Sequence, residues 1–233
     1  MRARTTTVLF DAGNTLIYMP RRPEEILQEL CAQIGEAIGL EEAREACRQS
    51  ERYYSQNYLG YTGDQGEFWH RYHGEALRYL GIEDPKGEKA AFLSHGFGRE
   101  GVWQPYPEAE EVCRRLRETG FRLGVVSNGS ITVSDLLSQA GLLPFLEVVI
   151  SSQAAGVQKP DPRIFAVALD RMGVSAGEAL YVGDLYEVDV LGARGAGLDA
   201  VLIDRERVWR DLDCPVIRSL EELLPLLTST GGE

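Results

Sequence analysis

Short runs of apolar and β-branched residues recur near the N-terminus and through the second half of the chain. Each run is bounded by glycine, asparagine or aspartate. Continuous apolar runs of this kind are typical of buried parallel strands, which are covered on both faces. The pattern predicts strands at residues 6–10, 122–126, 148–150, 179–182 and 200–203, with a last short strand near 215–217.

Segments with the apolar spacing of an α-helix separate the predicted strands. They cover residues 108–119, 134–140, 162–172, 188–196 and 220–227. Strands that alternate with helices form right-handed βαβ units, which place the strands side by side in one sheet. The sequence therefore predicts an α/β fold with a doubly wound parallel sheet.

The stretch between the first two strands has a different pattern, with helical periodicity but no convincing strand. Four amphipathic helices are expected in it, at residues 23–38, 41–54, 67–80 and 86–97. These helices interrupt the alternation of strands and helices. We therefore expect an α/β core domain of residues 1–17 and 103–233, with a helical domain of residues 18–102 inserted into it.

The composition narrows the classes of function. With 233 residues, of which 44% are hydrophobic, the chain can bury a substantial core. No apolar run approaches the roughly 20 residues that span a bilayer, and there is no signal-peptide core, so we expect a soluble, cytoplasmic protein with no membrane partner. A formal net charge of -12 without any block of basic residues argues against a nucleic-acid partner. The sequence carries no signal for a particular oligomeric state.

Cysteine and lysine are both sparse. The four cysteines form no CxxC pair and are expected to be reduced core residues, without a zinc site or disulfide framework: Cys31, Cys47, Cys113 and Cys214. Only three of the 24 basic residues are lysines. Lys86 and Lys89 lie in a polar stretch typical of a surface. Lys159 instead lies in the sequence KPDP, where a helix is predicted to begin.

Polar residues follow the predicted strands at the point where each strand ends. Asp11 follows the first strand, Ser127 the second and Asp184 the fourth. Ligands of open α/β sheets bind outside the carboxyl ends of the strands, so these side chains are expected at one edge of the sheet. The full set combines carboxylates, a hydroxyl and a lysine: Asp11, Asp184, Asp189, Ser127 and Lys159.

Carboxylates that are crowded in this way suit a hard divalent cation. Mg²⁺ binds proteins through one or two carboxylates together with waters and phosphate oxygens. A lysine and a hydroxyl can hold further phosphate oxygens, and phosphoryl transfer needs mainly positioning and stabilisation of charge. An ionised aspartate such as Asp11 can act as the nucleophile and form an aspartyl-phosphate. The residues therefore indicate Mg²⁺-dependent chemistry on a small phosphorylated substrate.

The order of these sites resembles the haloacid dehalogenase-like hydrolase superfamily, and the resemblance covers nearly the whole chain. The four motifs of the superfamily correspond to FDAGNTL at residues 10–16, VSNG at 126–129, GVQKPDP at 156–162 and VGDLYEVD at 182–189. Any one of these motifs is a weak signal, but four in the right order are a strong one.

The resemblance implies a role for each matching position. Asp11 is expected to be the nucleophile. The implied metal ligands are Asp11, the Gly13 carbonyl, Asp184 and Asp189. The implied phosphate-binding residues are Ser127, Asn128 and Lys159. The helical insertion corresponds to the cap that closes over the site in the family and selects the substrate.

Gly13 departs from the pattern of the family's phosphatases, which carry a second aspartate there that protonates the leaving group. Related enzymes that cleave phosphonates or carbon–halogen bonds also lack that aspartate. The dehalogenases, however, lack the metal-binding Gly-Asp pair that this chain keeps at 183–184, and the phosphonatases use a cap lysine for which Lys86 and Lys89 are candidates. Three interpretations stay open: a phosphatase that acts best on activated leaving groups, a phosphonate-type hydrolase, and a weak or degenerate member that binds a phosphorylated ligand or a partner.

Other polar and aromatic residues have a structural interpretation. Asn128 and Ser130 are expected to cap the following helix as well as, or instead of, contacting phosphate. The aromatic residues and histidines of 68–73 are expected to pack the core of the helical insertion, and neither they nor His95 show metal-ligand spacing.

Overall fold

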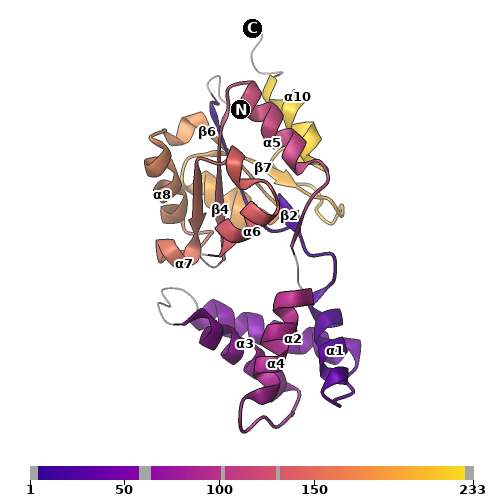
Figure 1. The fold of residues 1–233 in the computed structure, drawn as a ribbon. Helices are drawn as coiled ribbons and strands as arrows, with labels where there is room; N and C mark the ends of the chain where they lie inside the picture. The colour runs from indigo at the N-terminus through magenta and orange to yellow at the C-terminus, as the bar shows by residue number, and fades with distance from the viewer. Residues whose placement is uncertain (1–4, 58–63, 101–102, 130–131, 229–233) are drawn as a thin grey trace. The chain divides into compact units, whose positions relative to one another are not determined.

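The computed structural model describes residues 5–57, 64–100, 103–129 and 132–228. The chain divides into two compact units (Figure 1). One unit comprises residues 1–18 and 104–233, and the other comprises residues 19–103. Along the chain, the second unit is therefore an insertion into the first.

The larger unit contains a six-stranded parallel sheet with the strand order β5-β4-β1-β6-β7-β8. The strands are β1 (Thr7–Phe10), β4 (Arg122–Ser127), β5 (Val148–Ser151), β6 (Ala179–Gly183), β7 (Asp199–Ile203) and β8 (Val216–Ile217). The chain first adds strands on one side of β1 and then adds the rest on the other side. This reversal of direction makes the carboxyl ends of β4, β1 and β6 immediate neighbours, which is where an α/β sheet binds its ligand.

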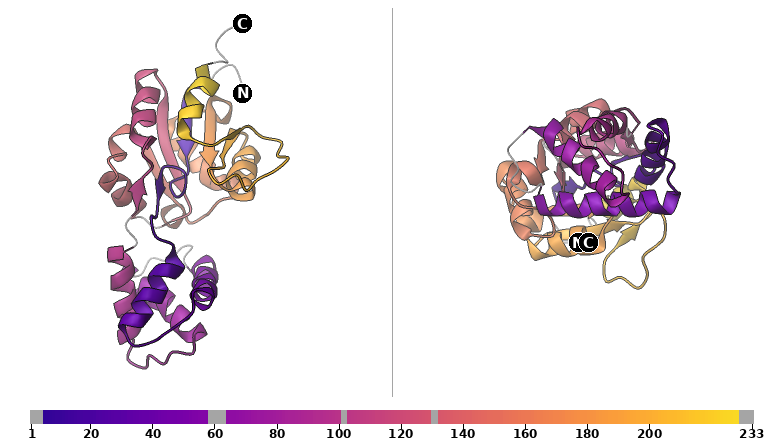
Figure 2. Two further views of the ribbon diagram at one scale, coloured as in Figure 1. Left: turned by 90° about the vertical axis from the view of Figure 1, so that its right-hand side faces the viewer. Right: turned by 90° about the horizontal axis from the view of Figure 1, so that it is seen from below.

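Helices flank this sheet (Figures 1 and 2). They are α5 (Ala109–Glu118), α6 (Val133–Gln139), the short α7 (Ser152–Ala155), α8 (Pro162–Met172), α9 (Leu191–Gly195) and α10 (Leu223–Thr228). Phe165 of α8 packs edge to face on Tyr181 of β6, with ring centroids 4.9 Å apart. Leu9, Val126 and Ile150 extend this buried cluster across three strands. The α/β fold predicted from the apolar runs is confirmed.

Some features of this unit differ from the prediction. A two-stranded antiparallel sheet pairs β2 (Ile17–Tyr18) with β3 (Gln104–Pro105) at the point where the chain leaves and re-enters the unit. A strand of two residues is too short to show any alternation of polarity, so these strands could not be predicted from the sequence. The helix expected at 188–196 begins instead as a π-helical turn, η3 (Tyr186–Val190), and only then becomes α9. Such single π-turns widen the backbone and occur often at functional sites.

The smaller unit is a helical domain. Its helices are α1 (Pro23–Gln33), α2 (Leu40–Asn57), α3 (Gln65–Tyr79) and α4 (Glu88–Glu100), one for each predicted segment. Leu27, Leu77 and Leu93 are buried at its centre. Among the described residues, no helix is long and apolar enough to cross a membrane.

Candidate functional site

Asp11 lies at the centre of the sheet edge. Phe10, the last residue of β1, is in register with Val125 of β4 and Val182 of β6. The backbone N–H of Asp11 then donates to the carbonyl of Val182 over 2.8 Å, which extends the ladder by one residue and fixes the direction of the Asp11 side chain. Asp11 is buried.

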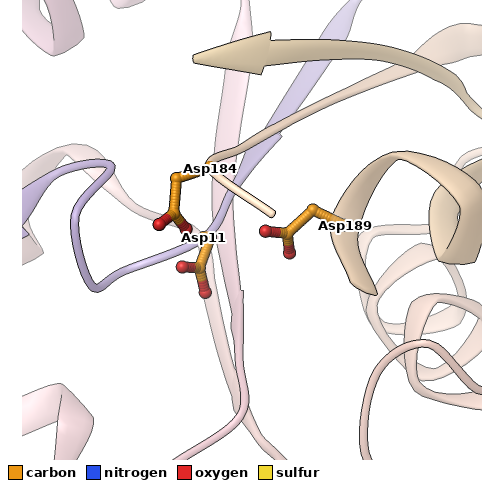
Figure 3. A group of neighbouring side chains, drawn as sticks. All are labelled: Asp11, Asp184 and Asp189. Carbon is orange, nitrogen blue, oxygen red and sulfur yellow. The ribbon is translucent and has the colours of Figure 1, made fainter. Parts of the chain in front are cut away.

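Two more carboxylates meet Asp11 at this edge. Asp184 follows β6 directly, and Asp189 lies in the π-helical turn that comes after it. Asp11, Asp184 and Asp189 each offer a carboxylate oxygen, and these oxygens all lie within 4.8 Å of one another (Figure 3). Three oxygen ligands at this separation could hold a hard cation such as Mg²⁺.

The local backbone explains how the Asp189 side chain reaches the carboxylates of Asp11 and Asp184. Its Oδ2 accepts a hydrogen bond from the N–H of Leu185 over 2.9 Å, which closes the turn. A Cβ atom on Gly183 would lie 2.4 Å from the Asp189 carboxyl carbon. Glycine is therefore required at 183, because any side chain there would displace Asp189.

Lys159 connects the carboxylates. Its Nζ donates to Asp11 Oδ1 over 2.6 Å and to Asp189 Oδ1 over 2.7 Å. The side chain is only 3% exposed, so these are buried, charge-assisted contacts. The isolated lysine of the sequence thus lies inside the predicted cluster.

Tyr181 is part of the same network, and sequence reasoning did not identify it. Its hydroxyl donates to the carbonyl of Val126 over 2.9 Å, accepts from Lys159 Nζ over 2.9 Å and lies 3.2 Å from Asp189 Oδ1. The available signal was a tyrosine inside an otherwise aliphatic buried strand, because a buried phenol needs a polar partner.

The charges of the cluster are not balanced. Three carboxylates face one ammonium group, and their burial opposes ionisation. Burial raises the pKa of Asp11 to about 6 against the lowering effect of Lys159. Burial, followed by repulsion from Asp11 and Asp189, raises the pKa of Asp184 to about 7. Although burial alone would lower it, the pKa of Lys159 is raised because Asp11 and Asp189 stabilise its charge.

Ser127 and Asn128 stand at the end of β4, beside Asp11. Ser127 is buried at that position. The Asn128 side chain donates from Nδ2 to the Lys159 carbonyl over 2.9 Å, and its Oδ1 accepts from the Lys159 N–H over 2.7 Å. The expected helix cap is therefore wrong for Asn128, whose amide instead fixes the backbone of Lys159. Ser130 lies outside the described residues.

Gly13 lies in the loop after β1, half-buried and joined to Ile17 by an isolated bridge. It is not among the described glycines with a positive φ, whereas its neighbour Asn14 has φ 53°. Position 13 therefore lacks the left-handed φ that would strain a residue with a side chain.

Lys86, Lys89 and His73 lie in the helical domain, whereas the four cysteines are spread over both units. Lys89 forms an ion pair with Glu36 over 2.5 Å, and Lys86 is exposed. His73 is buried, with Nδ1 2.8 Å from the Trp69 carbonyl, and burial lowers its pKa to about 4. The free thiols are buried or half-buried, as expected for core residues: Cys31, Cys47, Cys113 and Cys214.

Known proteins share this sequence pattern and fold. The family model of the haloacid dehalogenase-like hydrolases matches residues 5–197. Glyceraldehyde 3-phosphate phosphatase of Methanopyrus kandleri is 32% identical over 88% of this chain and 86% of its own. Haloacid dehalogenase-like hydrolase domain-containing protein 3 of Danio rerio is 30% identical over 96% of both chains. The solved structure of YfnB from Bacillus subtilis, described as a HAD-hydrolase bound to magnesium, has a TM-score of 0.75 at 24% identity and covers 97% of this chain and 99% of that one.

Proposed function

The chain belongs to the haloacid dehalogenase-like hydrolase family, and from this premise we propose that it is a Mg²⁺-dependent phosphatase of small phosphorylated metabolites with Asp11 as its nucleophile. The observation that carries the proposal is the buried group of Asp11, Asp184 and Asp189 with Lys159 among them. The phosphatase name of the relative from Methanopyrus kandleri supports the same class of reaction.

The donor set fits Mg²⁺. All three clustered side chains offer oxygen, which Mg²⁺ prefers, and the group carries an excess of negative charge over Lys159. The raised pKa values of Asp11 and Asp184 mean that ionising these carboxylates costs free energy in the metal-free site, and a bound cation would offset that cost. Asp11, Asp184 and the Gly13 carbonyl would hold the metal, with Asp189 ligating or supporting it. When bound, Mg²⁺ neutralises charge on the phosphoryl oxygens.

Asp11 attacks phosphorus in the first step. Lys159 holds Oδ1, which leaves Oδ2 as the attacking oxygen. The Oδ2–P bond forms as the P–O bond to the leaving group breaks, giving an aspartyl-phosphate and the leaving group as its anion, which is a carboxylate or phenolate, or an alkoxide that takes a proton from water. Water then attacks this phosphorus and gives up a proton to solvent as the P–Oδ2 bond breaks, which releases inorganic phosphate and returns the Asp11 carboxylate. Lys159 and Ser127 hold phosphoryl oxygens through both steps.

Gly13 determines which phosphate esters turn over fastest. With glycine at this position, the loop offers no carboxyl group to protonate a departing alkoxide. Acyl phosphates and aryl phosphates release stable anions and need little proton donation. We therefore propose a preference for activated leaving groups, with the helical domain as the cap that selects among substrates.

A phosphonate-type reaction is the second candidate, and Gly13 is the observation that favours it. That reaction would use a cap lysine, but Lys89 is paired with Glu36 inside the helical domain. The third candidate is a weak or degenerate member of the family that binds a phosphorylated ligand or a partner. The metal-ligating Gly183-Asp184 pair argues against carbon–halogen cleavage.

A phosphatase screen with and without Mg²⁺ tests the proposal. Acetyl phosphate, p-nitrophenyl phosphate, glyceraldehyde 3-phosphate and a phosphonate would be compared for wild type and Asp11→Asn. We expect phosphate release that needs Mg²⁺ and disappears in Asp11→Asn, since an amide is neither nucleophile nor anionic ligand. Undiminished release by that variant, or turnover of the phosphonate alone, would overturn it.

A further inference from the structure

We propose that Arg205 is a positioning residue, which fixes the loop after Asp11 so that the nucleophile and the Gly13 carbonyl stay in place. This inference rests on the proposed function, because it concerns the same site. Arg205 lies outside the four sequence motifs, two residues beyond the end of β7. It contacts the loop 191 and 190 positions away from itself in the chain.

The guanidinium holds two successive carbonyls of that loop. Its Nη2 donates to the Thr15 carbonyl over 2.9 Å, and its Nε makes a longer contact of 3.4 Å with the Asn14 carbonyl. The planar fork of arginine suits two acceptors held side by side, which a lysine ammonium cannot match in geometry. One side chain therefore fixes the orientation of two adjacent peptide planes.

The loop needs such a restraint. Asn14 has φ 53°, a left-handed conformation that is uncommon for a residue with a side chain. The N–H groups of Leu16 and Ile17 both donate to the Ala12 carbonyl, which closes the turn from the inside. Arg205 binds carbonyls of the same turn from the other side. A rotation of the peptide between Asn14 and Thr15 would be transmitted to the Gly13 carbonyl, because Asn14 follows Gly13 directly.

Arg205 is itself fixed by two neighbours. Its Nη1 donates to Glu108 Oε1 over 2.7 Å, and the two side chains are only 17% and 14% exposed. Its guanidinium lies 3.4 Å from the ring centroid of Tyr106, and that ring stacks on Tyr18 with centroids 4.7 Å apart. Glu108 balances the charge of Arg205. Arg205 is therefore expected to act by orienting the loop, and not by attracting the negatively charged substrate.

The stacked rings of Tyr18 and Tyr106 lie near the two points at which the chain passes from one compact unit to the other. Tyr18 ends β2, and Tyr106 follows β3 by one residue. These are the two points at which the chain passes between its compact units. Arg205 thus contacts both the loop after Asp11 and the stacked rings beside the two connecting segments.

Arg205→Ala and Arg205→Lys test the proposal, with Arg210→Ala as the matched control. Arg210 is an exposed arginine in the same loop that contacts the carbonyl of its neighbour Trp209. For each folded variant, Mg²⁺ binding is measured by calorimetry without substrate, together with kcat and the Mg²⁺ concentration for half-maximal activity. Residues that orient metal ligands typically account for about 10–100-fold in metal affinity or activity, and we expect a loss of that order in Arg205→Ala. Arg205→Lys should recover part of it, and Arg210→Ala should match wild type.

A second pair of variants addresses Arg205 through its partner. Glu108→Gln should weaken Mg²⁺ binding in the same direction but less, and combining it with Arg205→Ala should add nothing, because Glu108 acts through Arg205. The control for Glu108→Gln is Glu110→Gln, at an exposed position in the first turn of α5, which begins directly after Glu108. If Arg205→Ala lowers only the melting temperature and leaves Mg²⁺ binding and kcat unchanged, the positioning role is overturned. If instead wild type shows no Mg²⁺-dependent hydrolysis, or Asp11→Asn retains it, the proposed function fails, and Mg²⁺ binding to Arg205→Ala still tests the role of Arg205 in the loop.

Discussion

The Nζ of Lys159 lies 2.6 Å from Oδ1 of Asp11, although the two residues are 148 positions apart in the chain. The same ammonium also binds Asp189 over 2.7 Å. Lys159 therefore has two tasks in the proposed reaction. It holds together buried carboxylates that would otherwise repel one another, and it stands where a phosphoryl group must approach Asp11.

Lys159→Met should separate these two tasks. Without substrate or metal, the variant leaves Asp189 as an unpaired buried charge, and breaking a buried ion pair in this way typically costs about 3–5 kcal/mol of stability. Saturating Mg²⁺ should restore part of that loss. The rate should still fall by about 10²–10³-fold, as for the removal of one group that stabilises transition-state charge.

Lys86→Met is the control for this experiment, because Lys86 is exposed in the helical domain. Thermal unfolding and steady-state kinetics with and without Mg²⁺ give both readouts. Full activity in folded Lys159→Met would exclude the lysine from the chemistry. A loss in Lys86→Met would favour the phosphonate-type reaction instead.

Tyr181→Phe should lower both stability and activity. The change removes a hydroxyl that bonds the Val126 carbonyl and Lys159 but keeps the ring that packs on Phe165. Each lost hydrogen bond typically changes stability by about 1 kcal/mol, so losing these two should lower stability by about 2 kcal/mol. Lys159 loses one of its three oxygen partners, so we expect about a 10-fold fall in kcat, at the lower end of the effect of residues that orient a site. The exposed Tyr79→Phe is the control, and equal kcat in the two variants would contradict a role for the hydroxyl.

Much of the site could be predicted because its residues follow strands in the sequence. The apolar runs located β1, β4 and β6, and the residue after each strand then had to lie at one edge. The bounds of α8 were predicted as observed, since Asp161 caps its start, Pro162 opens it and Gly173 ends it with φ 65°.

The remaining parts depend on contacts that no local pattern encodes. Asn128 reaches the backbone of Lys159 across 31 positions, and Arg205 reaches Thr15 across 190. Asparagine is common in turns and helix caps and arginine on surfaces. The sequence therefore pointed to a phosphate contact or a helix cap for Asn128 and to no role for Arg205. The π-helical turn was missed for a related reason: the apolar spacing of 188–196 fits an α-helix, while the inward turn of Asp189 depends on the glycine at 183.

Asp11 and Asp184 should each lower the stability of the metal-free protein as the pH rises from about 4 to about 7, while His73, whose pKa is lowered to about 4 by burial, acts in the opposite direction. Burial raises the pKa of Asp11 to about 6 and that of Asp184 to about 7, both above the ordinary value of 3.8. Between the unfolded and folded pKa values the folded state binds more protons than the unfolded state, so stability decreases with increasing pH in that window. Below about pH 4 both states are protonated and the penalty vanishes.

Calorimetric melting at several pH values, with and without Mg²⁺, measures this penalty. Mg²⁺ should raise the melting temperature most near and above pH 7, where the carboxylates must be ionised. Asp184→Asn should flatten the decrease and weaken Mg²⁺ binding, because it removes both a titrating group and a charged ligand. A metal-free protein whose melting temperature rises steadily from pH 4 to 7, with no difference in Asp184→Asn, would contradict the electrostatics described for this cluster.

Gly13→Asp should reduce the preference of the enzyme for activated leaving groups by speeding the turnover of alkyl phosphates. In the family's phosphatases an aspartate at this position protonates the departing oxygen, and Gly13 lacks the positive φ that would strain an aspartate here. General acid catalysis is typically worth about 10²–10⁴-fold, so turnover of alkyl phosphates should rise by up to that factor. Acetyl phosphate should change little, since its carboxylate leaves without a proton. Gly13→Asn, of the same size but without an acidic proton, is the matched control, and Mg²⁺ binding by both variants verifies that the loop is intact. If folded, metal-binding Gly13→Asp accelerates alkyl phosphates no more than Gly13→Asn does, then proton donation from position 13 is not what limits this enzyme, and the natural substrate is one whose leaving group departs unaided.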